Sequence, residues 1–369
     1  MKKSFFVLSL MVTAMLAANV WAAGSYSDCY GASGCTACAN AKTGEVSAGC
    51  YYAISDDGKT LNVYGPTSTE TNADGTLKET TTIPTYAFID WATKDTSIPG
   101  VENVNITGNV ISIGSTSFYH APAKNITLPE TVQTIEPYAF STAELTEITI
   151  PASVTTLGDY SFNGTSNLAT VNFAENSHLE TIGSAAFNHS TFSSITLPDS
   201  LREVGESAFG HNPNLTSITL PEGLTDLGYA FLSRSNNVVS VYLPESLFAN
   251  GAAGLNPVAF GYLNNATIYC PQGNQTCLNY QLPICPSGVS DANENLCVYA
   301  SDAPNISFDT YTTDGDGMYV VDGKRYASFA DMAQGINAMM LRRIYTVEEA
   351  RQAVEAAGSD TVKVRIRYK

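Results

Sequence analysis

A unit of 22 residues recurs through the middle of the chain and constrains the fold more than any other feature. The segments Leu145–Phe162 and Phe192–Phe209 place their apolar residues, a proline, a glycine and a final phenylalanine at corresponding offsets. A fixed period of this length is typical of a solenoid, in which each unit buries its apolar face against its neighbours. The units close on a series of aromatic residues: Phe88, Phe118, Phe140, Phe162, Phe187, Phe209, Phe231 and Phe260.

Each part of the unit predicts one part of a solenoid turn. The alternating Leu145, Ile148 and Ile150 predict a short strand with one buried face, and Pro151 ends it because proline cannot donate to a ladder. Two further apolar residues return the chain along an irregular convex side, and Gly158 permits a tight turn. We therefore expect one parallel strand per repeat on the concave side, with strands about 4.8 Å apart.

The repeat motif resembles a known class. The segment Ile195–Phe209, with Leu197-Pro198 and Ala208-Phe209, resembles the BspA-like leucine-rich repeats of bacterial surface proteins, as do the units ending at Phe140 and Phe231. The resemblance covers residues 83–271. It implies a curved leucine-rich repeat solenoid, a secreted or cell-surface location, binding to proteins or host matrix, and no catalytic residue. The class often has Cys three residues after the Phe, whereas this chain has other residues there.

The first 22 residues predict a secretory signal peptide. A basic start at Lys2-Lys3 precedes an apolar run from Phe5 to Val20, and small residues follow at Ala22 and Ala23. The alternative is a membrane anchor, but the run is short for a helix that needs roughly 20 apolar residues to span a bilayer. We expect export to the cell surface or medium, and no transmembrane segment in the mature chain.

Eight cysteines predict disulfide-bonded caps at the two ends of the repeats. They form one group before the repeats and one after them, and an exported chain with even Cys groups favours disulfides within each group. The caps are expected at 23–82, with a hairpin at 51–64, and at 272–300. The alternative is a zinc or redox site around Cys35 and Cys38, which has no supporting context. The cysteines are Cys29, Cys35, Cys38, Cys50, Cys270, Cys277, Cys285 and Cys297.

Residues 301–369 predict a small α+β module. Met318–Val321 and Lys324–Tyr326 flank Asp322-Gly323 and predict a hairpin. A capping box at Thr346 and Glu349 predicts a helix, and 361–369 alternates apolar with basic residues like a strand. Residues 341–369 carry a net charge of +3, so the rest of the chain carries −20 of the total −17. A packed terminal module is one interpretation, and a sorting or docking signal for the envelope is the other.

Charge and motifs exclude several functions. A net charge of −17 with 14% charged residues argues against nucleic acid, which requires clusters of Lys and Arg. Phosphate loops, nucleophile elbows and zinc-protease helices are absent from the sequence, so we expect neither catalysis nor a cofactor. His189 and His211 could stack in adjacent units, but no carboxylate or Cys recurs beside them to complete a metal site. The segment 314–317 suggests a calcium loop yet lacks the further acids and closing Glu.

The outward positions of the predicted strands form the candidate binding face. They are almost all Ser, Thr or Asn, and become aromatic toward the C-terminal end, where Tyr residues suit an interface. We therefore predict a non-catalytic protein that binds a protein or glycan in adhesion. A structural envelope protein and, with less support, a glycan-active enzyme are the alternatives. The candidate residues are Asn105, Thr127, Glu147, Thr149, Asn172, Thr196, Thr219, Tyr242 and Tyr269.

Overall fold

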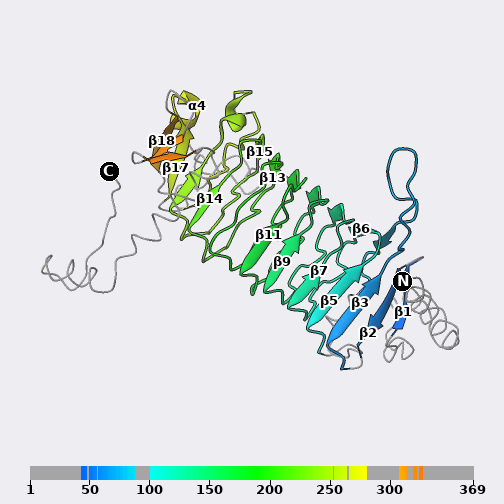
Figure 1. Ribbon diagram of the computed structural model, residues 1–369. Helices are drawn as coiled ribbons and strands as arrows, with labels where there is room; N and C mark the ends of the chain where they lie inside the picture. Colours follow the sequence, from blue (N-terminus) through cyan, green and yellow to red (C-terminus); the bar gives the residue numbers. More distant parts are fainter. Residues whose placement is uncertain are drawn as a thin grey trace, which may run out of the picture.

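The chain forms a stack of strand-bearing turns that runs from one end of the molecule to the other (Figure 1). The computed structural model describes residues 43–47, 50–55, 57–88, 100–251, 253–263, 266–280, 307–313, 319–321 and 324–326. Several predictions fall outside these residues: the signal peptide, the 314–317 loop, the terminal helix and strand, and Cys29, Cys35, Cys38, Cys285 and Cys297. The solenoid itself is confirmed.

One ladder of parallel strands follows the predicted Leu-x-x-Ile-x-Ile positions, and we call its outer surface the strand face. This ladder is divided into three separate sheets, and strands of different sheets are not hydrogen-bonded to one another. The unit containing Ile195 has no strand in the ladder. The parts are β3 (Thr60–Tyr64), β5 (Asn103–Thr107) and β7 (Asn125–Thr127); then β9 (Glu147–Ile150) and β11 (Thr170–Phe173); then β14 (Ser217–Thr219), β16 (Ser240–Tyr242), β17 (Thr267–Pro271) and β18 (Ser307–Thr313).

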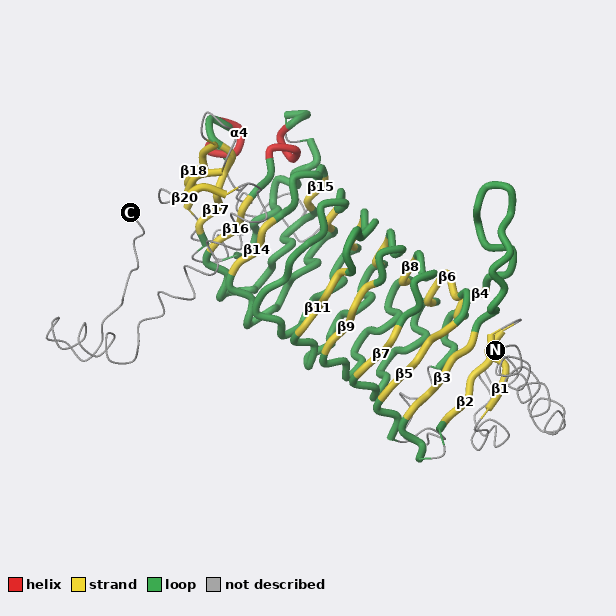
Figure 2. Tube along the Cα trace, viewed as in Figure 1, coloured by secondary structure: helices red, strands yellow, loops and turns green. Residues whose placement is uncertain are grey.

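The opposite side is more regular than expected. Instead of an irregular return, it carries a second parallel ladder of seven short strands without interruption (Figure 2). Most of these strands are two residues long, with one partly buried or exposed residue and one buried apolar residue, as in Thr156 and Leu157. The strands are β4 (Thr81–Ile83), β6 (Val110–Ile113), β8 (Thr134–Ile135), β10 (Thr156–Leu157), β12 (Thr181–Ile182), β13 (Glu203–Val204) and β15 (Asp226–Leu227).

A column of phenylalanine rings fills the stack between the ladders. Phe88, Phe118, Phe140, Phe162 and Phe187 are each at most 1% exposed, and every ring stacks on the next. The column continues to Phe209, and successive ring centroids lie 5.1 to 5.8 Å apart. Such contacts join neighbouring units only, so the core is a chain of local interactions.

The column changes at Phe231, where the prediction of the repeat register is wrong by one residue. In regular units the N–H of each Phe donates to the carbonyl of the residue before the next Phe, as from Phe187 to Ala208. The N–H of Phe209 donates instead to the carbonyl of Phe231 itself. Phe231 therefore occupies the small-residue position and Leu232 occupies the place of the ring. Both side chains are buried, and Phe231 meets Phe260 edge-on at 72°.

The role assigned to the repeat glycine is also wrong. Gly158 is absent from the positive-φ glycines, whereas Tyr160, two residues later, has φ of 58°. A Cβ on Gly158 would lie 2.6 Å from the backbone nitrogen of Pro137 in the preceding unit. Glycine is thus required by the close approach of neighbouring backbones. The left-handed Tyr160 is held by its N–H, which donates to the carbonyl of Ser184 at 2.7 Å.

The two predicted hairpins are confirmed, and each joins the repeat ladder. Strand β2 (Cys50–Ile54) pairs antiparallel with β3 and with β1 (Thr43–Ser47), while β3 pairs parallel with β5. At the other end, β19 (Tyr319–Val321) pairs antiparallel with β20 (Lys324–Tyr326) and with β18. Strand β18 was not predicted; it extends the ladder beyond β17.

A disulfide fastens the C-terminal end of the ladder. Cys270 in β17 is bonded to Cys277 in the short helix α4 (Gln275–Leu278), and both cysteines are buried. Asn274 caps α4 by accepting from the Cys277 N–H at 3.0 Å. A further short helix, η2 (Glu245–Phe248), follows β16. The observed pair lies within the second Cys group as predicted, and the remaining pairings stay predictions.

Candidate binding face

The pleat of the strands separates buried from outward residues along the strand face. In β9, Ile148 and Ile150 are at most 1% exposed, whereas Glu147 and Thr149 on the same strand are exposed. The alternation places one or two polar side chains per turn on the surface. Of the candidate residues, Thr127, Glu147, Thr149, Asn172 and Thr196 are exposed, while Asn105, Thr219 and Tyr269 are partly exposed.

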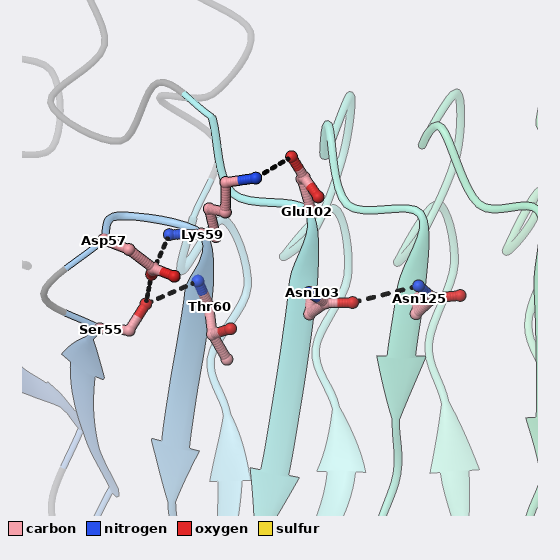
Figure 3. A network of polar contacts seen from close by, with 7 residues as sticks. All are labelled: Ser55, Asp57, Lys59, Thr60, Glu102, Asn103 and Asn125. Carbon is pink, nitrogen blue, oxygen red and sulfur yellow. Dashed lines mark hydrogen bonds and ion pairs between the residues drawn. The ribbon is translucent and has the colours of Figure 1, made fainter.

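Amide side chains at the N-terminal end of the face are linked across strands. The Nδ2 of Asn125 donates to the Oδ1 of Asn103 at 3.1 Å (Figure 3), and Asn105 donates in the same way to Asn62 at 3.2 Å. Equivalent residues in parallel strands lie at the ladder spacing, which brings two short amides within reach. These bonds fix the amide orientations, so the surface offers hydrogen-bonding groups in a regular row.

An ion pair and a capped turn attach the hairpin to the first repeat. Lys59 Nζ lies 3.0 Å from Glu102 Oε1, with the two side chains 55% and 46% exposed (Figure 3). The hydrogen bond from Lys59 to Glu102 raises the lysine pKa. In the turn before β3, the hydrogen bond from Ser55 to Asp57 lowers the pKa of that carboxyl. Exposed pairs of this kind contribute little stability, so they orient the hairpin more than they hold it.

Tyr242 corrects the prediction of an aromatic binding end. Its side chain is 1% exposed, and the neighbouring outward positions Ser217 and Ser240 are also buried. The ring stacks on Tyr269 in the next strand at 4.6 Å and 9°, so each tyrosine covers a face of the other. Alternation gives the side of the sheet on which a residue lies, but it does not show whether that side is covered. Tyr242 therefore belongs to the interior, and Tyr269 remains partly exposed.

Sequence analysis missed the start of the face. Strand β3 has the same alternation as the repeats, with Leu61 and Val63 fully buried and Tyr64 45% exposed. Asn62 and Tyr64 are in register with Asn105 and Thr107 of β5. The turn signal and the nearby Cys group indicate a capping hairpin here, and the structure shows that its second strand also belongs to the ladder. The Leu-x-Val alternation before Tyr64 was the available signal, and it extends the candidate face by one strand.

The strand face opens beyond β11. A groove of about 810 Å³ lies between β11 with its following loop and the strandless segment 193–200. Thr170 and Asn172 line it on one side, and Ser194 and Thr196 on the other. Phe173, which aligns with the buried Ile150, is only partly buried at this edge. In the groove, polar side chains lie beside an edge of β11 that pairs with no strand.

The predicted histidine stack forms on another surface of the turns. His189 and His211 stack with centroids 4.2 Å apart. Burial, followed by the nearby His189 and Arg234, lowers the pKa of His211. Within the described part of the chain, no three His, Cys, Asp or Glu residues come together as metal ligands would. In the same residues, every helix is too short or too polar to cross a bilayer.

Leucine rich repeat proteins are among the solved structures that are similar to this chain. A search of curated proteins finds no significant match. Among solved structures, a leucine rich cell surface protein from Faecalibacterium prausnitzii is 17% identical over 71% of this chain and 93% of its own, with a TM-score of 0.30. The leucine rich repeat protein of T. pallidum is 19% identical over 54% of this chain and 82% of its own, with a TM-score of 0.32.

A family model matches the repeats themselves. Six copies of the BspA type leucine rich repeat region match residues 81–178 and 176–277, which together are more than half of the 369 residues. The matched range contains β4 through β17 and ends within α4, so it covers most of the stacked turns. The predicted resemblance is confirmed, and the chain belongs to the BspA type leucine rich repeat family.

Proposed function

We propose that the chain is an exported, non-catalytic adhesion protein that binds a protein or glycan ligand through the strand face. The observation that carries the proposal is the row of exposed, almost uncharged side chains from Thr127 to Thr196 on a rigid stack. Repeat solenoids present extended surfaces of this kind to partners. Export is supported by the N-terminal sequence pattern.

The composition of the face supports binding over catalysis. Glu147 is the one charged residue among the candidate positions, whereas glycan hydrolysis requires a pair of carboxyl groups on opposite sides of the bond. The Thr and Asn side chains both donate and accept hydrogen bonds, which suits hydroxyl groups of a glycan and backbone groups of a protein equally. The face therefore suits binding of a partner, and the experiment below distinguishes a protein ligand from a glycan.

The test compares two variants with the same change of charge. Glu147→Arg with Thr149→Arg alters exposed positions of β9, and Glu130→Arg with Gln133→Arg alters exposed positions outside the strand face. Each mature protein is applied to arrays of matrix proteins and envelope glycans. We expect the first variant to lose at least about tenfold in affinity and the second to change less than about twofold. Equal losses, or no ligand for the unaltered protein, would favour the structural alternative.

A further inference from the structure

The backbone of β11 has an open edge toward the next unit. Its four residues pair with β9 on one side, from Thr170 opposite Glu147 to Phe173 opposite Ile150. On the other side, no backbone hydrogen bond joins 170–173 to 193–197, both of which are fully described. In a parallel ladder, half of the N–H and C=O groups of a strand point to each neighbour. The groups of β11 that point away from β9 therefore face the groove.

The opening follows a unit of unusual length. The unit that contains β11 spans 25 residues from Phe162 to Phe187, whereas the next spans 22 from Phe187 to Phe209. Part of the extra length forms the loop after Phe173, whose Ala174, Asn176 and Ser177 line the groove. On the opposite side of the same two units, β12 and β13 remain paired. The two turns thus stay joined at this ladder and by the hydrogen bond from the Thr191 N–H to the Leu168 carbonyl, and they part along β11 itself.

The lining of the groove limits its occupant. Asp199 is the one charged residue among the lining residues, in a protein whose net charge is −17. Ser, Thr and Asn side chains supply most of the polar groups, and the partly exposed Phe173 supplies an apolar surface. An anionic ligand would therefore lose hydration without finding a matching charge, and a cationic ligand would find only Asp199. The lining suits an uncharged segment with small or β-branched side chains.

We propose that this groove binds an extended, uncharged peptide segment of a partner protein, which adds as a strand to the open edge of β11. The proposal rests on the proposed function and names the ligand class for one site on the strand face. Main-chain hydrogen bonds to β11 give the affinity, as in other cases of strand addition. Alternate side chains of the segment contact Phe173 and the hydroxyl-rich wall around Thr196.

The test uses an immobilised library of random, uncharged seven-residue peptides with blocked ends. Retained peptides are measured against the full mature chain and two variants. Thr196→Trp places a large ring in the groove, and Gln133→Trp places the same ring outside the strand face; both positions are exposed. We expect Thr196→Trp to weaken binding at least about tenfold and Gln133→Trp to have little effect. Ser194→Trp repeats the first result at a second exposed position, and melting temperatures confirm that each variant folds.

Hydrogen exchange gives a readout that is independent of affinity. In the free protein the amides of 194–197 should exchange quickly, and a bound peptide should slow exchange along β11 or its facing segment. Two sets of alternate peptide nitrogens can be methylated. Methylation of the set whose N–H groups donate to β11 should abolish binding, because it removes those hydrogen bonds. A peptide that binds equally well with every nitrogen methylated would contradict strand addition.

The outcomes separate this proposal from the broader one. If no library peptide binds with a Kd below about 100 µM, or if Thr196→Trp leaves peptide binding intact, the groove proposal is wrong. The proposed function can survive that failure. It stands without the groove if Glu147→Arg with Thr149→Arg abolishes binding of the ligand found on the arrays. A glycan whose binding is lost in Thr196→Trp would assign the groove to a different ligand and overturn the peptide proposal.

Discussion

The centre of the stack and its C-terminal end differ in both their core and their surface. From Phe88 to Phe209 every turn contributes one ring to the same column, and the outward residues of the central strands are exposed. Beyond Phe209 the ring moves back by one residue to Phe231, and the outward Ser217, Ser240 and Tyr242 are buried. The repeat motif therefore specifies the turn reliably, whereas the surface that the turn presents depends on its position in the stack.

The difference is possible because interactions along the stack are local. A turn is held by the backbone hydrogen bonds and apolar contacts of its two neighbours, so one slipped ring leaves distant turns unchanged. The second ladder continues to β15 through the slipped unit, with Val204 still paired to Leu227. The second ladder therefore keeps its register even where the column of rings is shifted by one residue.

The largest expected effect is at the centre of the column. Phe162→Ala removes a ring that is 0% exposed and stacked on both Phe140 and Phe187. We expect unfolding free energy, measured in guanidinium chloride, to fall by about 3–5 kcal/mol, because a buried cavity remains. Val239→Ala, at a position that is 47% exposed, is the control and should change stability by less than about 0.5 kcal/mol. A loss below about 1 kcal/mol for Phe162→Ala would mean that the column is not the core.

The fold could be predicted from the sequence because periodicity reports burial directly. The alternation of Ile148 and Ile150 with polar neighbours, and the recurrence of Phe at one offset, each have a single physical interpretation. The slip at Phe231 could not be predicted in this way, because two large apolar residues, Phe231 and Leu232, compete for one position. Backbone hydrogen bonds decide between them. The spacing from the glycine agrees, because the ring follows Gly205 by four residues and Leu232 follows Gly228 by four.

The candidate site was predictable only in part, for a similar reason. Alternation placed Thr149 and Asn172 on the outer side of the sheet, where the structure has them exposed. It placed Tyr242 there too, although the side chain is buried against Tyr269. The groove depends on the spacing between two turns, and the repeat pattern does not report that spacing, because the opposite strands of the same two turns stay paired. The apolar–polar alternation therefore predicts the side of the sheet on which a side chain lies, whereas its exposure depends on how the neighbouring turns pack.

A smaller effect tests the slipped register. Exchanging Phe231→Leu with Leu232→Phe conserves volume and returns a ring to the column, so we expect the unfolding free energy to change by less than about 1.5 kcal/mol. The matched control, Ala208→Phe with Phe209→Leu, creates the same Phe-Leu order in a regular unit. It should cost about 1–3 kcal/mol or more, because Phe would be forced into the small-residue position. The register assignment would be wrong if the first exchange destabilised the protein more than the control.

The smallest effect concerns the histidine pair, which lies at the boundary between the two regions. Burial and the neighbouring His189 and Arg234 lower the pKa of His211, and its Nδ1 is buried without a hydrogen-bond partner among the described residues. The unfolded chain, with an ordinary histidine pKa of about 6.5, then binds more protons than the folded chain as pH falls below that value. This histidine therefore lowers stability on acidification and has no effect well above pH 6.5. Melting temperatures at pH 7.5 and 5.5 should differ less in His211→Gln than in the unaltered protein.

His178→Gln is the matched control for this last prediction, because His178 is exposed and its Nδ1 lies 3.0 Å from the carbonyl oxygen of Ala152, away from the pair. This substitution leaves the burial of His211 and its stacking on His189 in place. His189→Gln should reduce the dependence partly, since it removes one of the two nearby charges but leaves the burial of His211 in place. If His178→Gln and His211→Gln changed the pH dependence equally, the effect would belong to histidine titration in general and not to the stacked pair.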